Sequence, residues 1–306
     1  MMLALTYGQQ LMKKLPIPQL KRDQVLIRVK AASLNNIDLI QMKFLHKFNT
    51  KRIIGTDIAG VVIKRGKDVK NISLGENVFG LTNSSGAFAQ YALIDQKNIA
   101  HKPSRLSFEE ACTLPTPCGT ALSAVQKIKS GHHLRILIDG STGGVGLYVL
   151  QLAQRINAQI TVTCSSHNAS YMKKLGVNNI IPYDKQNITK GHTQFDVIIV
   201  VNGRNKIRNY RKILKSGGEA IFIGGLASNV IEAMLLGWIM RGKSQHISAA
   251  SMIFLKGNWM KRLAKLVNDD VIHPYIDKIF SWHYFSEALT YKRQHHSRGQ
   301  IVFKID

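Results

Sequence analysis

The segment IDGSTGGVGLYVLQLAQ, residues 138–154, joins an apolar strand-like run to an apolar helix-like run through a turn that contains four glycines. Glycine permits the tight bend that such a turn needs and lets other groups approach the backbone closely. The helix that follows begins with unpaired backbone N–H groups, which favour a bound anion. The segment therefore predicts a strand, a phosphate-binding turn and a helix in immediate succession.

The region around this turn alternates between strand-like and helix-like runs from about residue 115 onwards. The expected strands are short β-branched runs: LRILIDG, QITVTCS, NIIPY, FDVIIVV and EAIFIGG. The expected helices between and before them include TALSAVQKI, GLYVLQLAQRI, NASYMKKLG and NKIRNYRKILKSGG. This alternation is typical of a parallel sheet with helices on both faces. We therefore expect a doubly wound Rossmann domain over residues 115–272.

The first third of the chain has a different pattern, because short strands follow one another with glycine or polar breaks between them. Examples are QVLIRVKAASL, DIAGVVIKRG, ENVFGL and FAQYALI. Strands spaced in this way indicate a barrel-like domain. The last segment predicts a helix and a terminal strand, QIVFKI, which we expect to join the same domain. The predicted division is residues 1–114 with 273–306, and residues 115–272.

The glycine turn has the context that a dinucleotide-binding turn requires, since it lies between a predicted strand and a predicted helix within a series of βα units. Its glycines serve the bend, the approach of the pyrophosphate and the packing of helix on strand. The predicted cofactor-binding residues of this region are Ser141, Thr142, Gly143, Gly144, Val145, Gly146, Gly203 and Gly224.

The second expected strand indicates which dinucleotide binds. A site specific for NAD places an acid near the end of that strand to bind the ribose 2′-OH. No Asp or Glu occurs between Asp139 and Asp184, and the strand ends in Cys164, Ser165 and Ser166. Neutral donors tolerate a 2′-phosphate that a carboxylate would repel, so NADPH is the predicted cofactor.

Composition excludes several other classes of protein. The chain has 42 Lys and Arg against 18 Asp and Glu, a formal charge of +24, but no nucleic-acid-binding motif accompanies this charge. A nucleic-acid or other polyanion partner is therefore possible but not favoured over a generic basic surface. The three cysteines form no CxxC pair. No apolar run is long enough to span a membrane and no secretory signal is recognisable, so we expect a cytoplasmic protein.

Several motifs together resemble the medium-chain dehydrogenase/reductase superfamily, in its zinc-free quinone oxidoreductase branch. They are VLIRVKAASLNNIDL, IIGTDIAGVV, LGENVFGL, LSFEEACTLPTPCGTALSAV, DVIHPYIDKIF and RGQIVFKI, and they span nearly the whole chain. Two positions depart from the family pattern. Glu76-Asn77 stands in place of the acid of the usual Gly-Asp-x-Val turn, and Gln300 stands where lysine is common. The resemblance implies that the barrel-like domain is a GroES-like β-barrel catalytic domain and that the chain forms a homodimer.

The resemblance also implies roles for individual residues. Asn35 and Thr120 match the polar residues near the reacting end of the cofactor, and are the predicted catalytic residues. The run TCSSHNASYMKKLG followed by IIPY is similar to mitochondrial reticulon-4-interacting proteins and plastid quinone oxidoreductase homologues. In those proteins the matching serine, asparagine and tyrosine hold the adenosine 2′-phosphate, which implies this role for Ser165, Asn168 and Tyr183.

The positions where zinc-dependent relatives place cysteine and histidine hold Asn35 and Thr56, so no catalytic zinc is predicted. Without a Lewis acid an alcohol is hard to oxidise, whereas a quinone or α,β-unsaturated carbonyl already accepts a hydride. We therefore expect hydride transfer from NADPH to such a substrate, with water as the proton source. His46 is a possible proton donor, since the tyrosine frequent after the Asn-x-x-Asp turn is absent and Phe44 and His46 lie in that region.

Two alternatives remain open at this point. One is an NADPH-binding protein of weak catalytic activity that binds RNA or another polyanion. The other is an alcohol or carbonyl dehydrogenase. A salt-dependent RNA complex abolished by NADPH, or a pH-dependent oxidation of alcohols, would distinguish them.

Overall fold

The computed structural model of the chain describes residues 1–6, 12–45, 52–82, 86–129, 131, 133–225, 227–239, 244–294 and 297–306. It divides into two compact units: unit 1 comprises Met1–Pro117 and Lys256–Asp306, and unit 2 comprises Cys118–Leu255. The chain returns to unit 1 at Lys256 rather than at residue 273, where sequence analysis places the boundary. The reason is that α8 (Trp259–Asn268) packs against β7 (Ile99–His101) of unit 1.

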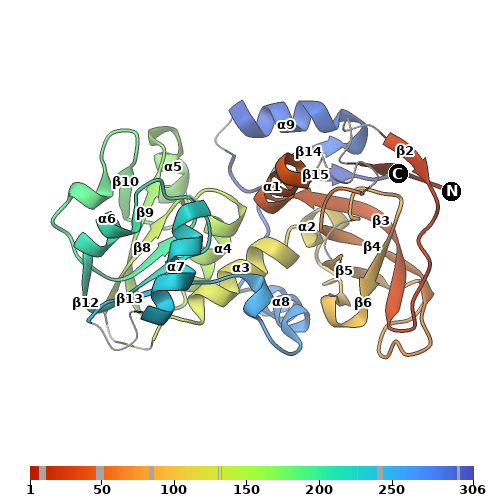
Figure 1. The fold of residues 1–306 in the computed structure, drawn as a ribbon, viewed down its shortest axis with the longest axis horizontal. Helices are drawn as coiled ribbons and strands as arrows, with labels where there is room; N and C mark the ends of the chain where they lie inside the picture. Colours follow the sequence, from red (N-terminus) through yellow and green to blue (C-terminus); the bar gives the residue numbers. More distant parts are fainter. Residues whose placement is uncertain are drawn as a thin grey trace. The chain divides into compact units, whose positions relative to one another are not determined.

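Unit 2 is built on a six-stranded parallel sheet in the order β10-β9-β8-β11-β12-β13 (Figure 1). Its strands are β8 (Leu134–Asp139), β9 (Ala158–Cys164), β10 (Asn179–Pro182), β11 (Phe195–Val200), β12 (Leu214–Phe222) and β13 (His246–Ala249). The chain begins in the middle of the sheet, runs outward to β10, and then crosses to β11 and continues to β13. Because parallel crossovers are right-handed, the helices of the two halves cover opposite faces of the sheet.

The helices of unit 2 connect these strands. They are α4 (Gly144–Ala153), α5 (Ser166–Lys174), η2 (Ile188–Lys190), α6 (Ile207–Lys212), α7 (Ala227–Ile239) and η3 (Met252–Phe254), while α3 (Pro115–Val125) runs from unit 1 into unit 2. The prediction of one long helix over NKIRNYRKILKSGG is wrong. The helix ends at Lys212, and Leu214 already pairs with Phe195 of β11. Gly217 follows with φ of +78°, a left-handed conformation that a helix interior does not contain.

Unit 1 contains a seven-stranded sheet in the order β14-β15-β3-β4-β5-β7, with β6 paired to β3. Its strands besides β7 are β3 (Gln24–Leu34), β4 (Asp57–Arg65), β5 (Asn77–Leu81), β6 (Tyr91–Asp95), β14 (Ile276–Ser281) and β15 (Gln300–Lys304). A separate two-stranded sheet pairs β1 (Met2–Leu5) with β2 (Met12–Leu15). The terminal strand β15 lies in the sheet of unit 1, antiparallel to β3. Sequence analysis missed β14, which pairs parallel with β15.

The helices of unit 1 besides α8 are α1 (Asn36–Leu45), η1 (Gln96–Asn98), α2 (Phe108–Ala111), η4 (Trp282–Tyr284) and α9 (Phe285–Gln294). Local sequence explains the start of α2, where Ser107 and Glu110 form a capping box. The Glu110 N–H donates to Ser107 Oγ at 3.1 Å, and the Ser107 N–H donates to Glu110 Oε2 at 2.8 Å. The two bonds satisfy backbone donors that the first turn of a helix leaves unpaired.

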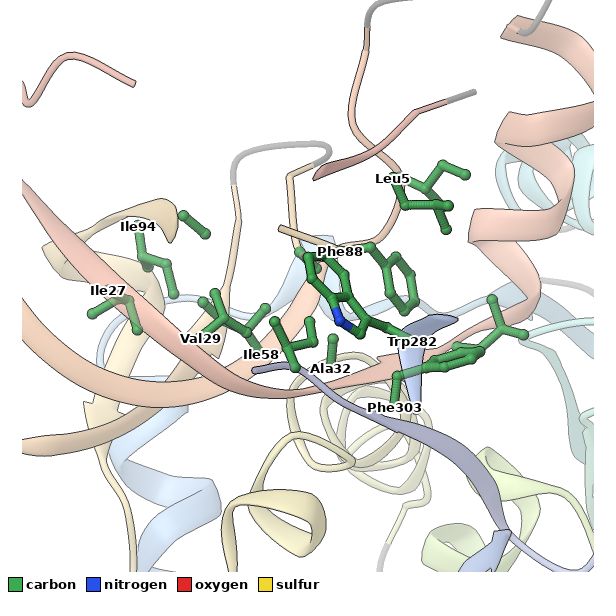
Figure 2. Close-up of a cluster of buried hydrophobic side chains, with 14 of the residues drawn as sticks. Leu5, Ile27, Val29, Ala32, Ile58, Phe88, Ile94, Trp282 and Phe303 are labelled. Carbon is green, nitrogen blue, oxygen red and sulfur yellow. The ribbon is translucent and has the colours of Figure 1, made fainter. Parts of the chain in front are cut away.

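Each unit has its own hydrophobic core. In unit 1 the core lies between strands and the C-terminal helix, and Figure 2 shows Phe88, Trp282 and Phe303 among its side chains. The Phe88 ring packs edge-on against Phe303 and Phe285, with centroids 5.2 and 5.5 Å apart. In unit 2 the Tyr210 and Phe222 rings make a similar contact at 5.6 Å. Burial of such rings stabilises the core of each unit.

Candidate functional site

The glycine turn lies at the carboxyl end of β8, the first strand of the parallel sheet, where open α/β sheets bind ligands. Gly140 has φ of +93°, and a Cβ there would lie 2.8 Å from the Asn202 backbone nitrogen. A Cβ on Gly146 would lie 2.4 Å from the Gly140 carbonyl oxygen, so only glycine lets α4 pack this close to the turn. By contrast, no atom lies within 4 Å of the Cβ position of Gly143.

The start of α4 is open to a ligand. Gly143 is its N-cap residue and offers no side-chain cap, so the first N–H groups of the helix receive no such hydrogen bond. Thr142, Gly144 and Val145 are half-buried around this opening. Unpaired N–H groups beside free space are what an anion such as a pyrophosphate needs.

Ser141, one of the predicted cofactor-binding residues, has a buried side chain. Its side chain is fully buried, and its hydroxyl and its N–H both donate to the Thr163 carbonyl oxygen, at 3.1 and 3.2 Å. The hydroxyl thus ties the turn to β9 rather than facing the opening of the turn.

A buried acid at the end of β8 holds the turn in place, and sequence analysis missed it. The Asp139 carboxylate accepts hydrogen bonds from the hydroxyls of Thr163 and Tyr210. Burial, and then Asp139 itself, raise the pKa of Tyr210. Gly203 packs against this cluster, because a Cβ there would lie 1.9 Å from the Tyr210 hydroxyl. The absence of a side chain at Gly203 is therefore required by Tyr210.

Gly224 lies where β11 and β12 end side by side. A Cβ on Gly224 would be 2.2 Å from the Val201 carbonyl oxygen. The next residue, Gly225, has φ of +86°, and a Cβ there would be 2.5 Å from the Gly203 carbonyl oxygen. The structure thus brings Gly203 and Gly224 together at the carboxyl edge of the sheet, the edge that also carries the glycine turn.

A second polar cluster follows β9 and β10, the two strands on the other side of β8. Ser165 is buried, and its Oγ has no hydrogen-bond partner among the described residues. Partial burial raises the pKa of the exposed Tyr183, and the adjacent Ser165 hydroxyl and the Arg204 guanidinium lower it. Asn168 is fully buried one turn into α5, and its N–H donates to the Ser165 carbonyl oxygen at 2.9 Å. The structure thus brings Ser165, Asn168 and Tyr183 together and adds a cation, Arg204.

Asp184 is a further member of this cluster that sequence analysis did not consider. Its carboxylate accepts from the Ser166 N–H at 2.8 Å and the Ser166 hydroxyl at 2.6 Å, which caps α5. These hydrogen bonds lower the pKa of Asp184. The carboxylate is engaged by Ser166, so Ser165 rather than Ser166 is the available hydroxyl at this end of β9.

Unit 1 carries its own buried polar cluster, centred on Asn35. The Asn35 N–H donates to Asp38 Oδ2 at 2.7 Å, and its side-chain Oδ1 accepts from Gln300 Nε2 at 3.0 Å. The Thr56 hydroxyl lies 3.1 Å from Asp57 Oδ1 and 3.5 Å from Asp38 Oδ1, and therefore bridges the two acids. Within the described part of the chain, Asn35 Nδ2 is buried without a hydrogen-bond partner.

The two carboxyl groups of this cluster are fully buried and strongly perturbed. Burial raises the pKa of Asp38 to about 8, and the nearby Asp57 adds to the shift while Lys292 opposes it. Burial also raises the pKa of Asp57 to about 6, while hydrogen bonds from Thr116 and the nearby Asn35 side chain lower it. Near neutral pH the pair therefore tends to hold one proton, because two buried like charges are costly.

The two predicted catalytic residues belong to different units. Asn35 follows β3 in unit 1, and Thr120 lies on α3 in unit 2. Both side chains are more than nine-tenths buried in the chain, at 5% and 8% exposure. His46 and the side chain of Phe44 lie outside the described residues.

Metal-ligand chemistry is poorly represented in the described ranges, where no group of three or more His, Cys, Asp or Glu could hold a metal ion. The three cysteines are buried, and burial raises the pKa of each thiol.

None of the helices in the described part of the chain has the length and apolar character needed to cross a bilayer.

Comparison with known proteins finds two dehydrogenase domain models and several oxidoreductase relatives. The alcohol dehydrogenase GroES-like domain model matches residues 21–104, and the zinc-binding dehydrogenase model matches residues 144–269. The chloroplastic quinone-oxidoreductase QR1 of Triphysaria versicolor is 29% identical, over 94% of this chain and 92% of that protein. The chloroplastic NADPH-dependent alkenal/one oxidoreductase of Arabidopsis thaliana is 26% identical, over 94% and 73% respectively.

Among solved structures, the quinone oxidoreductase from Coxiella burnetii superposes with a TM-score of 0.87 at 27% identity, covering 100% of this chain and 99% of that one. The predicted fold class, a Rossmann doubly wound parallel sheet plus a GroES-like domain, is confirmed.

Proposed function

The chain belongs to the quinone oxidoreductase branch of the medium-chain dehydrogenase/reductase superfamily, and from this membership we propose that it reduces quinones or α,β-unsaturated carbonyl compounds with NADPH and without zinc. It is an oxidoreductase of this superfamily, and its relatives imply a nicotinamide cofactor. The observation that carries the proposal is the glycine turn, with the free space at Gly143 beside the uncapped start of α4.

The residues present fit a bound dinucleotide. The N–H groups at the start of α4 would hold the pyrophosphate, since Gly143 leaves its place open and Gly146 keeps the helix close. Thr142, Gly144 and Val145 would line the same place. When bound, NADPH supplies the hydride. Gly203 and Gly224 contribute indirectly, because they allow the neighbouring strand ends to approach.

The donor set does not favour zinc. Asn35 and Thr56 offer an amide and a hydroxyl at the positions of cysteine and histidine ligands, and zinc in proteins prefers thiolate, imidazole and carboxylate. A substrate that is already electrophilic needs only a hydrogen-bond donor at the oxygen that gains charge. In this proposal Asn35 Nδ2 is that donor, Thr120 is a second polar group near the reaction, and unit 1 is the catalytic domain.

The direct test measures NADPH oxidation by the purified chain with menadione or methyl vinyl ketone, and NADP⁺ reduction with ethanol, each with and without a chelator. Turnover of menadione or methyl vinyl ketone that the chelator leaves unchanged supports the proposal. Stoichiometric zinc together with activity lost to the chelator would overturn its zinc-free part. Oxidation of ethanol with NADP⁺ as the dominant activity would favour the dehydrogenase alternative.

The preference for NADPH is proposed to come from Ser165, Asn168 and Tyr183, with Arg204 as a cation nearby. Replacing Ser165 by Asp is expected to weaken NADPH binding about ten-fold or more, because the carboxylate repels a 2′-phosphate and a donor worth about 1–2 kcal/mol is lost. NADH affinity should be spared, since a carboxylate accepts from a free ribose 2′-OH. Calorimetric titration of both cofactors measures this.

The matched control is Ser170→Asp, which adds the same charge to an exposed position of α5. This control separates a direct effect of the new carboxylate on the 2′-phosphate from a general weakening of NADPH binding by the lower positive charge of the chain. Equal affinities of the wild-type chain for NADH and NADPH would contradict the proposed preference.

We further propose a homodimer formed through β13 and α7. In the described part of unit 2, β13 is an edge of the sheet and α7 packs against it. Ile231 and Leu235 of α7 are 61% and 64% exposed, and an unpaired edge beside apolar side chains favours pairing with a second copy. Sedimentation at micromolar concentration should give a dimer, and the double replacement of Ile231 and Leu235 by Glu should give a monomer. A wild-type monomer would contradict the proposal.

A further inference from the structure

Gln300 and Asn35 form a buried pair of amides in unit 1. Strand β15 runs antiparallel to β3 with Ile301 opposite Leu34, and this register places Gln300 beside Asn35. Gln300 Nε2 donates to Asn35 Oδ1 at 3.0 Å, and each residue is 5% exposed. A hydrogen bond between two buried amides is directional, because each amide has a donor end and an acceptor end.

Both partners are held firmly. The Gln300 N–H donates to the Tyr275 carbonyl oxygen at 2.9 Å, and Gly299 before it has φ of +113°. A Cβ on Gly299 would lie 2.2 Å from that same Tyr275 oxygen, so the close approach depends on glycine. On the other side, the Asn35 N–H is fixed by Asp38 Oδ2 at 2.7 Å. The backbone N–H of Gln300 and that of Asn35 are therefore each held by a hydrogen bond, which limits the movement of the two side-chain amides.

The pair sets which end of the Asn35 amide is free. Since Gln300 donates to Oδ1, the Nδ2 group faces away from Gln300, and it is the buried donor that lacks a hydrogen-bond partner in the described part of the chain. The Asn35 side chain also lowers the pKa of Asp57, as an N–H₂ group beside a carboxylate does. If the Asn35 amide were rotated by 180°, its N–H₂ group would face the N–H₂ group of Gln300, and its oxygen would face the Asp57 carboxylate. Both neighbours thus favour the same orientation.

We propose that Gln300 is a positioning residue that keeps the Asn35 N–H₂ group directed as a donor to the carbonyl oxygen of a quinone or enone. The inference rests on the proposed function, because it concerns the same reaction. Gln300 itself need not touch the substrate. A donor that must stay oriented while charge develops on the substrate oxygen is effective only if its own partner is fixed.

The test compares two variants at this position, with menadione and methyl vinyl ketone as probes. Gln300→Met keeps the length of the side chain but removes the donor, and is expected to lower kcat about ten-fold or more with little change in KM or in NADPH affinity. Gln300→Lys keeps a donor for Asn35 Oδ1 and is expected to restore most of kcat. In an Asn35→Ala background, Gln300→Met should cause no further loss, because Gln300 acts through Asn35.

Gln24→Met is the matched control for structural damage. Gln24 is also a buried glutamine of unit 1, at 7% exposure, and its Nε2 donates to Asp95 Oδ1 at 2.9 Å. Its loss should lower the melting temperature without a selective fall in kcat. The inference is overturned if Gln300→Met leaves kcat unchanged, lowers it equally in the Asn35→Ala background, or is not restored by Gln300→Lys.

A readout that does not depend on activity separates this inference from the proposed function. If the wild-type chain reduces neither probe, the proposed function fails. In isotope-labelled protein, the Asn35 side-chain amide should then still give a distinct, slowly exchanging NMR signal in the wild type and in Gln300→Lys, and lose it in Gln300→Met. A signal unaffected by Gln300→Met would show that Gln300 does not hold the amide.

Discussion

Replacement of Asp38 by Asn is expected to make the protein more stable than the wild type near pH 8 and to flatten the dependence of its stability on pH. Asp38 is fully buried, and burial raises its pKa from an ordinary 3.8 to about 8. The folded protein therefore holds a proton that the unfolded chain has already released. Stability from this proton is fully present below pH 3.8 and is lost as the pH rises through about 8.

The expected size follows from linkage. One proton bound only in the folded state changes the free energy of unfolding by about 1.4 kcal/mol per pH unit. Asp57, with a pKa of about 6, acts in the same direction over a lower range. Between about pH 6 and pH 8 the wild type should thus lose about 2 to 3 kcal/mol that Asp38→Asn retains. Urea unfolding at a series of pH values measures both proteins.

A suitable control is Asp68→Asn. Asp68 is exposed and pairs with Arg22 at 2.7 Å, and such surface ion pairs contribute little to stability because solvent screens them. This variant should keep the pH dependence of the wild type. If Asp38→Asn keeps it as well, the proton is not held at Asp38, and the perturbed acid of the cluster must be sought elsewhere.

Replacement of Gly146 by Ala is expected to destabilise the protein and to abolish cofactor binding together. The added Cβ would lie 2.4 Å from the Gly140 carbonyl oxygen and 2.7 Å from the backbone of Ser141. Backbone atoms cannot rotate away as a side chain does, so α4 must shift away from the turn. Overpacking of this kind costs about 1–3 kcal/mol or more, and the shift also displaces the N–H groups proposed to bind the pyrophosphate.

Gly143→Ala separates the two effects. No atom lies within 4 Å of its Cβ position, and its φ is −75°, so alanine fits the folded chain. The stability should stay within about 1 kcal/mol of the wild type, since losing a glycine N-cap and reducing the freedom of the unfolded chain oppose each other. NADPH binding should still fall about ten-fold or more, because the methyl group fills the space left for the phosphate. Thermal unfolding and cofactor titration of both variants measure this.

The contrast between the two glycines is what the proposal of a cofactor turn requires. If Gly143→Ala binds NADPH as the wild type does, the free space at Gly143 is not where the pyrophosphate lies. If Gly146→Ala is as stable as the wild type, the close packing of α4 on the turn has no energetic consequence.

The sequence by itself determined the Rossmann unit and its turn. Strand, glycines and helix are consecutive in residues 138–154, and glycine is the residue that adopts the left-handed conformation of Gly140 without steric cost. The alternation of strand-like and helix-like segments around the turn is also a property of neighbouring residues. The structure has β8, β9, β10 and β11 where these segments predict strands. Hydrophobic periodicity reports such elements because it depends on neighbouring residues only. The expected grouping of Ser165, Asn168 and Tyr183 came instead from the family resemblance of this stretch of chain.

Only the tertiary structure decided which polar groups meet, because their partners are distant in sequence. Tyr210 reaches Asp139 across 71 positions and thereby explains Gly203, and Gln300 reaches Asn35 across 265. Tertiary pairing also explains why the helix predicted over NKIRNYRKILKSGG ends at Lys212. Leu214 pairs with β11, and this pairing outweighs the local helical preference. The pKa of Asp38 belongs to this class as well: a carboxyl group shows no sign in the sequence of being buried, and burial is what raises its pKa.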